Sequence, residues 1–461
     1  MNLSAVGGFP DPPLAATILG MDELFDLPPT EANPAEPAGR GRPRLQRPQR
    51  DQITLRPSDL ESLLPPDHRA RLVWAFVESL DLGAFHARIR AIEGHSGRPP
   101  IDPAILVSLW LYATLEGVGS ARALDRLCDE HDAYRWLAGG VGVNHHTLAD
   151  FRVEQADLLD ELLTQSVAAL LATGEVSLTR VAHDGIRVRA GAGAASFRRR
   201  ATLERALAEA DAQVRALKTE LDEDPAATSR RVVAARERAA TERAARVRRA
   251  LEQLPAIEAA KRRNRKKDRP LEEARASTTD PEARVMRLGD GAYRPAWNGQ
   301  YTTDVESGLV VGVDVTNRGS DQGELTPAIA GLERRFGRRP AEVLADGGYV
   351  ALPEIEALAE GGSRLYAPPM VPRDPSRDPY RPLSADSPPV AEWRTRMGTD
   401  EAKAIYRQRA ATAEWVNALA RNRGLQQFRV RGLERVRSVL LWFALAHNLD
   451  RTLALRAGAA G

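Results

Sequence analysis

The sequence contains very little cysteine and no long hydrophobic run. Its single cysteine among 461 residues, Cys128, excludes an internal disulfide and fits a reducing cytoplasm. No apolar run approaches the roughly 18 residues that a membrane-spanning helix needs. The N-terminus has no basic segment followed by an apolar core, so we expect no secretion signal. With 43% apolar and 28% charged residues, the composition is that of a soluble protein. The length predicts about two to four domains.

The net charge is small but unevenly distributed. The whole chain carries +2, whereas residues 197–270 contain 21 Lys and Arg against 12 Asp and Glu, a local charge of +9 that leaves −7 elsewhere. A basic segment on a mildly acidic chain indicates a polyanionic partner. A solvated helix surface is the alternative interpretation.

Residues 1–50 are rich in Pro, Ala and Gly and have few large apolar side chains. Such a segment cannot bury enough surface to fold, so we predict a disordered arm. Within it, Arg40-Gly-Arg42-Pro-Arg44 resembles an AT-hook, whose Arg side chains enter a narrow minor groove. A plain basic arm that contacts phosphates is the alternative.

Residues 51–175 have a helical pattern of apolar residues. Asp102-Pro103 is typical of a helix start, with Pro in the first turn. Ser120 is a candidate cap for the next helix. Several short helices with tight turns could include a helix-turn-helix, although any small helical bundle has the same spacing.

Residues 197–284 predict an inserted helical hairpin. Apolar residues recur at alternating spacings of four and three in two runs, and Pro225 lies in the turn between them. Each run is too short and Ala-rich for a structural coiled coil between chains, so an intramolecular hairpin is favoured. The hairpin ends in a basic cluster that includes Arg262, Arg263, Lys266 and Lys267.

The remaining chain predicts a mixed sheet covered by helices, which is an α+β fold. Period-two patterns predict strands at 178–189, 298–305, 309–315 and 341–345, while 323–336, 352–360 and 400–455 are helical and 368–395 is loop-like.

Three carboxylates stand out in this pattern. Asp184 and Asp346 follow apolar runs on strands that we expect to be adjacent, and Glu414 lies on an Arg-rich helix. Alone, each has an ordinary explanation as a turn residue, a helix cap or a surface ion pair. Together, acids on rigid elements can bind two divalent metals, and such a site cuts and rejoins phosphodiesters.

These carboxylates lie in segments that resemble a known family. Val181-Ala-His-Asp184-Gly, Leu344-Ala-Asp346-Gly-Gly-Tyr and Tyr406-x-x-Arg409 followed by Glu414 resemble the signature of bacterial insertion-sequence DDE transposases with a ribonuclease-H-like core. The group is the one called IS-eleven-eighty-two, near the IS-five branch. Segments 97–103, 146–152 and 431–437 resemble the same group.

The resemblance implies a domain layout. It implies a helical DNA-binding domain at 51–175, and a ribonuclease-H-like catalytic domain formed by 176–196 and 285–455. The basic hairpin at 197–284 would then interrupt the catalytic domain.

The resemblance also implies roles for single residues. Asp184, Asp346 and Glu414 would bind Mg²⁺, with Mn²⁺ as a substitute. Tyr406, Arg409 and Arg421 would position DNA phosphates. From charge rather than from the resemblance, we expect the basic residues of the arm and hairpin to add contacts, namely Arg40, Arg42, Arg262, Arg263, Lys266 and Lys267.

One spacing departs from the broader superfamily. Four residues rather than three separate Arg409 from Glu414. On an ideal α-helix this places Arg409 off the face of Glu414, whereas Arg421, two turns further on, shares that face.

The implied partners are double-stranded DNA, as terminal inverted repeats and as target, and a second copy of the chain in the synaptic complex. The implied location is the bacterial cytoplasm, at the nucleoid. A non-mobile nuclease with the same core and a decayed element that binds DNA as an inhibitor are the alternatives. Asn298 and Asp321 are weaker candidates for accessory roles at the site, and we favour simple turn chemistry for each.

Overall fold

The computed structural model describes residues 59–91, 99–223, 227–263, 273–372 and 374–459. The expected N-terminal arm with Arg40 and Arg42, and the basic residues Lys266 and Lys267, lie outside the described residues. Within the described part of the chain, no helix is both long and apolar enough to cross a membrane.

The first part of the structure is helical, as predicted. Asp102 caps α3 by accepting a hydrogen bond from the Ala104 amide at 2.8 Å, and Pro103 follows at the first helical position. Ser120 caps α4 in the same way through the Ala123 amide. The helical elements are η1 (Glu61–Leu63), α1 (Arg69–Glu78), α2 (Gly83–His86), α3 (Pro103–Leu115), α4 (Ala121–Glu130), α5 (Asp132–Ala138), α6 (His145–Glu154) and α7 (Ala156–Ala172).

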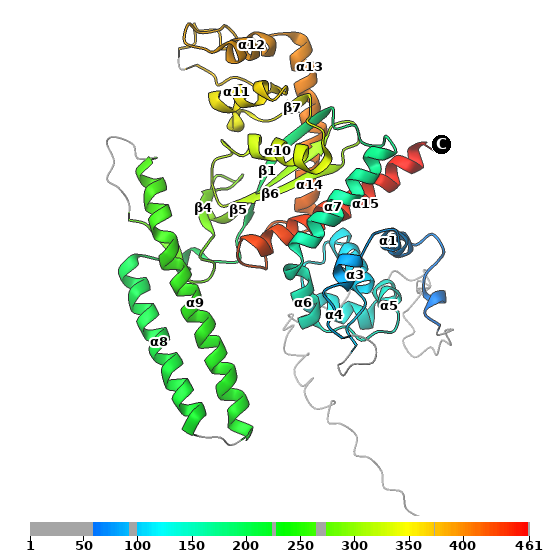
Figure 1. The fold of residues 1–461 in the computed structure, drawn as a ribbon, viewed down its shortest axis with the longest axis vertical. Coiled ribbons are helices and arrows are strands. Elements are labelled where there is room, and N and C mark those ends of the chain that lie inside the picture. Colours follow the sequence, from blue (N-terminus) through cyan, green and yellow to red (C-terminus); the bar gives the residue numbers. More distant parts are fainter. Residues whose placement is uncertain (1–58, 92–98, 224–226, 264–272, 373, 460–461) are drawn as a thin grey trace, which may run out of the picture. The chain divides into compact units, whose positions relative to one another are not determined.

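A mixed sheet follows, again as predicted (Figure 1). The strand order is β4-β5-β1-β7-β8, and β6 pairs with β5 beyond the part that β4 covers. β5 is antiparallel to β1 and β6, whereas β7 and β8 run parallel to β1. The strands are β1 (Arg180–Arg189), β4 (Arg284–Arg287), β5 (Tyr293–Asp304), β6 (Val310–Thr316), β7 (Glu342–Leu344) and β8 (Arg364–Tyr366).

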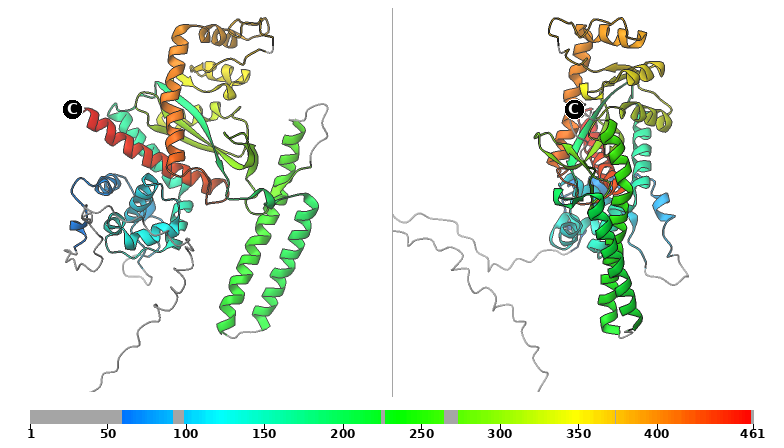
Figure 2. Two further views of the ribbon diagram at one scale, coloured as in Figure 1. Left: turned by 180° about the vertical axis from the view of Figure 1, so that it is seen from behind. Right: turned by 90° about the vertical axis from the view of Figure 1, so that its left-hand side faces the viewer.

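Two long helices are inserted between β1 and β4. α8 (Arg200–Glu223) and α9 (Ala227–Arg263) lie side by side in both views of Figure 2. Leu203 packs in a cluster with Val247 and Leu254, while Leu217 packs with Val233 and Ala240. This pairing of early with late residues makes the helices antiparallel. A short ribbon of β2 (Phe197–Arg198) and β3 (Ala276–Ser277) joins the two ends of the insertion, next to η2 (Ala194–Ser196).

The segment predicted as a loop, 368–395, is partly helical. α12 begins at Pro388, where two consecutive prolines occupy the first turn and need no amide donors. Its inner face buries Val390, Trp393 and Met397. The prediction was wrong because the prolines suggested a loop, although proline is tolerated where a helix begins. The other helices around the sheet are α10 (Leu325–Phe336), η3 (Gly347–Tyr349), α11 (Leu352–Glu360), α12 (Pro388–Met397), α13 (Asp400–Arg409), η4 (Ala410–Glu414) and α14 (Trp415–Asn422).

The last helix, α15 (Leu433–Ala459), packs against both the sheet and the N-terminal helices. Its predicted core residues are all buried, namely Val439, Leu440, Phe443, Ala444 and Leu445. The Asn448 side chain hydrogen-bonds both the amide and the carbonyl of Val310, at 2.8 and 2.7 Å. The Trp442 indole donates to the carbonyl of Arg152 on α6 at 3.0 Å. One helix therefore fixes the sheet and the helical region to each other.

Candidate active site

Asp184 and Asp346 lie at matching positions relative to two neighbouring parallel strands, Asp184 within β1 and Asp346 just after β7. In the register of β1 and β7, Ala182 pairs with Leu344, and each aspartate follows two residues later. Residues at equal distances along two paired parallel strands lie side by side, so the two carboxylates belong to the same region of the sheet. The register therefore brings together two acids that are 162 residues apart in the sequence.

Asp184 lies inside β1 rather than at its end, and its side chain is only 13% exposed. Its Oδ1 accepts a hydrogen bond from the Gly185 amide at 3.0 Å, and its Oδ2 accepts one from Asn417 Nδ2 at 3.0 Å. Burial raises the pKa of Asp184 to about 6, and nearby Asp346 adds to this shift while Arg409 opposes it. The environment thus favours a cation close to this carboxylate.

Asp346 lies two residues after the last residue of β7 and caps the short helix η3. Its Oδ1 accepts a hydrogen bond from the Gly348 amide at 2.8 Å, which leaves Oδ2 directed to the site. The side chain is 42% exposed, so this carboxylate faces solvent more than Asp184 does.

Glu414 ends a π-helical turn, η4, between α13 and α14. A π-helix closes its hydrogen bonds from residue i to i+5, so residues five apart return to the same side. Arg409 and Glu414 are five apart, and their side chains meet at 2.5 Å between Nη1 and Oε1. The expectation that Arg409 lies off the face of Glu414 was therefore wrong, because it assumed regular α-helical geometry.

The Arg409 guanidinium lies among all three carboxylates. Besides Glu414, its Nη2 lies 3.4 Å from Asp184 Oδ1 and 3.9 Å from Asp346 Oδ2. The Arg409 side chain is 10% exposed, and its Nε is buried without a hydrogen-bond partner. Burial alone would lower the pKa of Arg409, but the surrounding acids have the larger combined effect and raise this pKa. One buried cation thus holds the three acids together.

Two segments of the chain match known protein families. Residues 58–154 match the family described as "Transposase domain (DUF772)", and residues 384–453 match the family described as "Transposase DDE domain". The chain carries two transposase domains. The DDE domain match includes Arg409 and Glu414, whereas Asp184 and Asp346 lie outside both matched segments. No curated protein and no solved structure matches the chain.

The other residues predicted to bind DNA differ in their relation to this site. Tyr406 is partly buried one turn before Arg409, and burial raises the pKa of its hydroxyl, with Arg409 opposing and the three acids adding to the shift. Arg421 is exposed on α14, two turns beyond Glu414. Arg262 and Arg263 are exposed in the last turn of α9, on the inserted hairpin.

Sequence reasoning did not single out Asn417. It is buried on α14, one turn after Glu414, and it donates to Asp184 across 233 positions of sequence. Its own Oδ1 is buried without a hydrogen-bond partner. The only signal in the sequence is its spacing of three from Glu414, which places both residues on one helix face.

A polar cluster lies behind Asp184, on the other face of β1. Asp321 Oδ1 accepts hydrogen bonds from Asn298 Nδ2 at 2.6 Å and from Gln300 Nε2 at 3.2 Å, and Asp321 Oδ2 pairs with Arg187 at 3.0 Å. Asn298 lies within β5, so turn chemistry does not explain it. A Cβ on Gly185 would come within 3.0 Å of this cluster, which explains the glycine next to Asp184.

The three carboxylates supply the chemistry that a divalent metal needs, since Mg²⁺ prefers hard oxygen ligands. In this structure they surround a guanidinium, and among the described residues no three His, Cys, Asp or Glu form a ready metal-binding group. The three carboxylates therefore fit a divalent cation, on the condition that Arg409 withdraws from its present position.

Proposed function

We propose that the chain is a DNA transposase of the insertion-sequence type, of the IS-eleven-eighty-two group. It would cut DNA at the ends of its element in a metal-dependent reaction and join those ends to target DNA. The observation that carries this proposal is the convergence of Asp184, Asp346 and Glu414 on Arg409. The two transposase domain matches support it.

We further propose a division of the chain into domains. Residues 51–175 would form the DNA-binding domain. Residues 176–196 and 285–455 would form a ribonuclease-H-like catalytic domain, which the order β6-β5-β1-β7-β8 with one antiparallel half supports. Residues 197–284 would be an inserted arm whose basic surface contacts DNA.

Asp184, Asp346 and Glu414 would hold Mg²⁺, with Mn²⁺ as a substitute. When bound, the metal pair activates a nucleophile and stabilises the leaving oxygen of the phosphodiester. The residues of the chain do the remaining work. Asn417 orients Asp184 through its amide, while Tyr406, Arg409 and Arg421 bind phosphate oxygens of the strand to be cut.

Arg409 has two partners in this scheme. Without DNA its guanidinium pairs with the three acids, and with metal and DNA present it would turn to a phosphate. The guanidinium forms bidentate contacts with carboxylates and phosphates alike, so one side chain suits both states.

The test is a cleavage and joining assay with the full chain. The substrate is labelled double-stranded DNA that carries the inverted repeats flanking the gene, with a plasmid as target and Mg²⁺ or EDTA in the buffer. We expect Mg²⁺-dependent cuts at the repeat, free 3′-hydroxyl ends and joined products. Cleavage without joined products would assign a nuclease instead, and binding without cleavage would contradict the proposal.

Because two ends must be joined in one event, we further propose that two copies of the chain act together in the synaptic complex. The complex would form at the bacterial nucleoid. Analytical ultracentrifugation of the chain with and without end DNA tests the copy number.

A further inference from the structure

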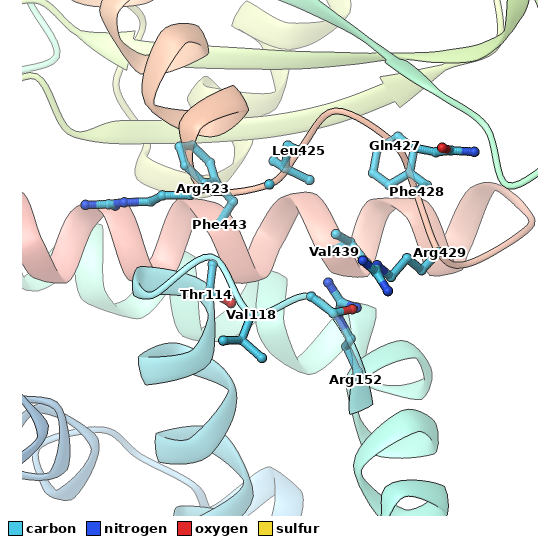
Figure 3. Close-up of a pocket in the computed structure, with 12 residues that line it drawn as sticks. Thr114, Val118, Arg152, Arg423, Leu425, Gln427, Phe428, Arg429, Val439 and Phe443 are labelled. Carbon is cyan, nitrogen blue, oxygen red and sulfur yellow. The ribbon is translucent and has the colours of Figure 1, made fainter. Parts of the chain in front are cut away.

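A small cavity lies between the N-terminal helices and the loop that joins α14 to α15 (Figure 3). Its volume is about 40 Å³, whereas about 10–15 Å³ is enough for one water molecule. The cavity is lined by the end of α3 and the turn after it, by Arg152 of α6, by the loop residues 423–429 and by α15. No residue of the three-carboxylate site lines it.

Arg152 enters this cavity without an acidic partner. Its Nη1 donates to the Gly119 carbonyl at 2.7 Å, and its guanidinium lies 4.6 Å from the centre of the Trp110 ring. Its Nε is buried with no hydrogen-bond partner. Burial, with a smaller effect from Arg429, lowers the pKa of Arg152 to about 10, so the side chain still carries its charge at neutral pH.

Arg429 approaches the same space from the loop, and Figure 3 shows the two guanidinium groups directed toward one another. Within the described residues, Arg429 forms no hydrogen bond through its side chain and neither arginine forms an ion pair with a carboxylate. A Cβ on Gly119 would lie 3.9 Å from Arg429 Nε and 4.0 Å from Arg152 Nη2, so both groups border one small volume.

Arg152 is a buried charge without a counter-charge, and buried charges are normally paired. Arg429 is exposed, but it carries the same sign of charge, and like charges that face each other repel. Arg423, a third arginine of the lining, uses Nη2 to bind Asp450 but leaves Nη1 buried without a hydrogen-bond partner. An anion that accepts several hydrogen bonds would supply the counter-charge for these groups.

We propose that this cavity, with Arg152 and Arg429 on its two sides, binds a phosphate group of the DNA backbone. The arginine fork matches phosphate oxygens and gives bidentate contacts. The assignment to DNA rests on the proposed function, whereas the binding of a phosphate group does not.

The position of the cavity suits a DNA strand that extends away from the carboxylate site. Glu414 and Arg423 stand at the two ends of α14, nine residues apart, which corresponds to about 13 Å along a helix. That length equals about four rises of 3.4 Å along one DNA strand. A phosphate a few nucleotides from the cut would thus be held between the N-terminal helices and the catalytic sheet.

The first arm of the test uses inorganic phosphate, at constant ionic strength against chloride. The key variant is Arg429→Gln, since Arg429 is exposed and its loss should not impair folding. Arg152→Lys is the second variant, which keeps the charge but not the fork. The matched control is Arg338→Gln, an exposed arginine before β7, at the strand end opposite Asp346.

We expect phosphate to raise the melting temperature of the wild type and of Arg338→Gln, and to have little effect on the two pocket variants. Without phosphate, Arg429→Gln should be at least as stable as the wild type, because the repulsion from Arg152 is removed. An equal response to phosphate in Arg429→Gln and the wild type would overturn the proposal.

The second arm measures binding to inverted-repeat DNA by fluorescence anisotropy over a series of salt concentrations. Loss of one phosphate contact should weaken binding about fivefold near 0.15 M salt and reduce the slope of log affinity against log salt by about 0.9. Arg338→Gln should change neither. A phosphate response with an unchanged slope would overturn the assignment to DNA and leave a site for free anions. Neither arm depends on cleavage, so failure of the transposase proposal would appear in the cleavage and joining assay and not in these two measurements.

Discussion

Arg409 and Glu414 contact each other across a π-helical turn, with Nη1 and Oε1 2.5 Å apart. The turn accommodates one residue more than a regular helix needs between these two side chains. The same guanidinium reaches Asp184 and Asp346. The geometry of the helix at 410–414 thus decides whether Glu414 joins the two aspartates.

The π-helical turn predicts an asymmetric tolerance to length changes. Deleting Ala411, which is exposed, would leave Arg409 and the glutamate four residues apart, which is one turn of a regular α-helix. We expect this deletion to keep most of the cleavage activity. Inserting one alanine after Ala411 should turn the glutamate away and cost about 100-fold or more. Equal losses in both variants would show that the turn has another role.

Asn417 predicts a positioning effect on Asp184. Asn417→Ala removes the hydrogen bond at 3.0 Å to Oδ2, and partners of metal ligands typically contribute about 10- to 100-fold to metal affinity or activity. We expect a loss of this size in cleavage, together with a higher Mg²⁺ requirement. Asn422→Ala, an exposed amide at the end of the same helix, is the control and should behave as the wild type. A normal Mg²⁺ requirement in Asn417→Ala would contradict the role.

Replacement of Arg409 should have opposite effects on the stability of the protein and on its affinity for metal. In Arg409→Gln three acids face one another without a cation. Only the pair with Asp184 is buried on both sides, and breaking such a buried pair costs about 3 kcal/mol. The metal-free variant should therefore unfold more readily in urea. Mg²⁺ should stabilise this variant at a lower concentration than it stabilises the wild type, because no guanidinium competes with the metal for the three acids. If Mg²⁺ affects both proteins equally, Arg409 does not occupy the cation position.

Two buried histidines predict acid sensitivity. Burial lowers the pKa of His183 and of His447 to about 4, from an ordinary value of 6.5. The unfolded chain therefore binds more protons than the folded one between these values, and stability is lost as the pH falls from about 6.5 toward 4. Asp184, whose pKa is raised to about 6, acts in the opposite sense and offsets part of this loss.

The measurement is urea unfolding in EDTA from pH 7.5 to 4.5. We expect a steady fall in the free energy of unfolding below pH 6.5, and a shallower fall in His447→Gln. A stability independent of pH in this range would contradict the assignment of both histidines as buried and neutral.

A larger residue at position 185, next to Asp184, should destabilise the protein through steric overlap. An added Cβ would lie 2.8 Å from Asn298 Oδ1, 2.9 Å from Gln300 Nε2 and 3.0 Å from Asp321 Oδ1, closer than contacts normally allow. Gly185→Ala should destabilise the protein by about 1–3 kcal/mol, as overpacking does. Gly193→Ala has nothing within 4 Å of the added carbon and serves as the control. Equal melting temperatures for the two variants would disprove the close approach.

Much of the fold follows from local patterns in the sequence. The alternation around Asp184 and the short apolar run before Asp346 predict their strands, and Asp102 and Ser120 mark the starts of α3 and α4. These signals are local because strand periodicity and helix capping depend on neighbouring residues.

The parts that were missed depend on contacts between distant segments or on rare helix geometry. Asn417 meets Asp184 and Asn298 meets Asp321 only after the sheet and the helices have formed. The π-helical turn at η4 has no sequence signature beyond the unusual spacing from Arg409 to Glu414. Sequence patterns predict the helices and strands, whereas tertiary packing decides which polar groups share a site.

The most direct test of the central claim compares the cleavage rates of Asp184→Asn, Asp346→Asn and Glu414→Gln with that of the triple variant, on end DNA in Mg²⁺. Residues that act as one unit lose function together, so each single variant should fall to the rate of the triple variant while still binding DNA. Asp314→Asn, an exposed acid on β6, should cut as the wild type does. A single variant that cuts at the wild-type rate would contradict a shared three-carboxylate site.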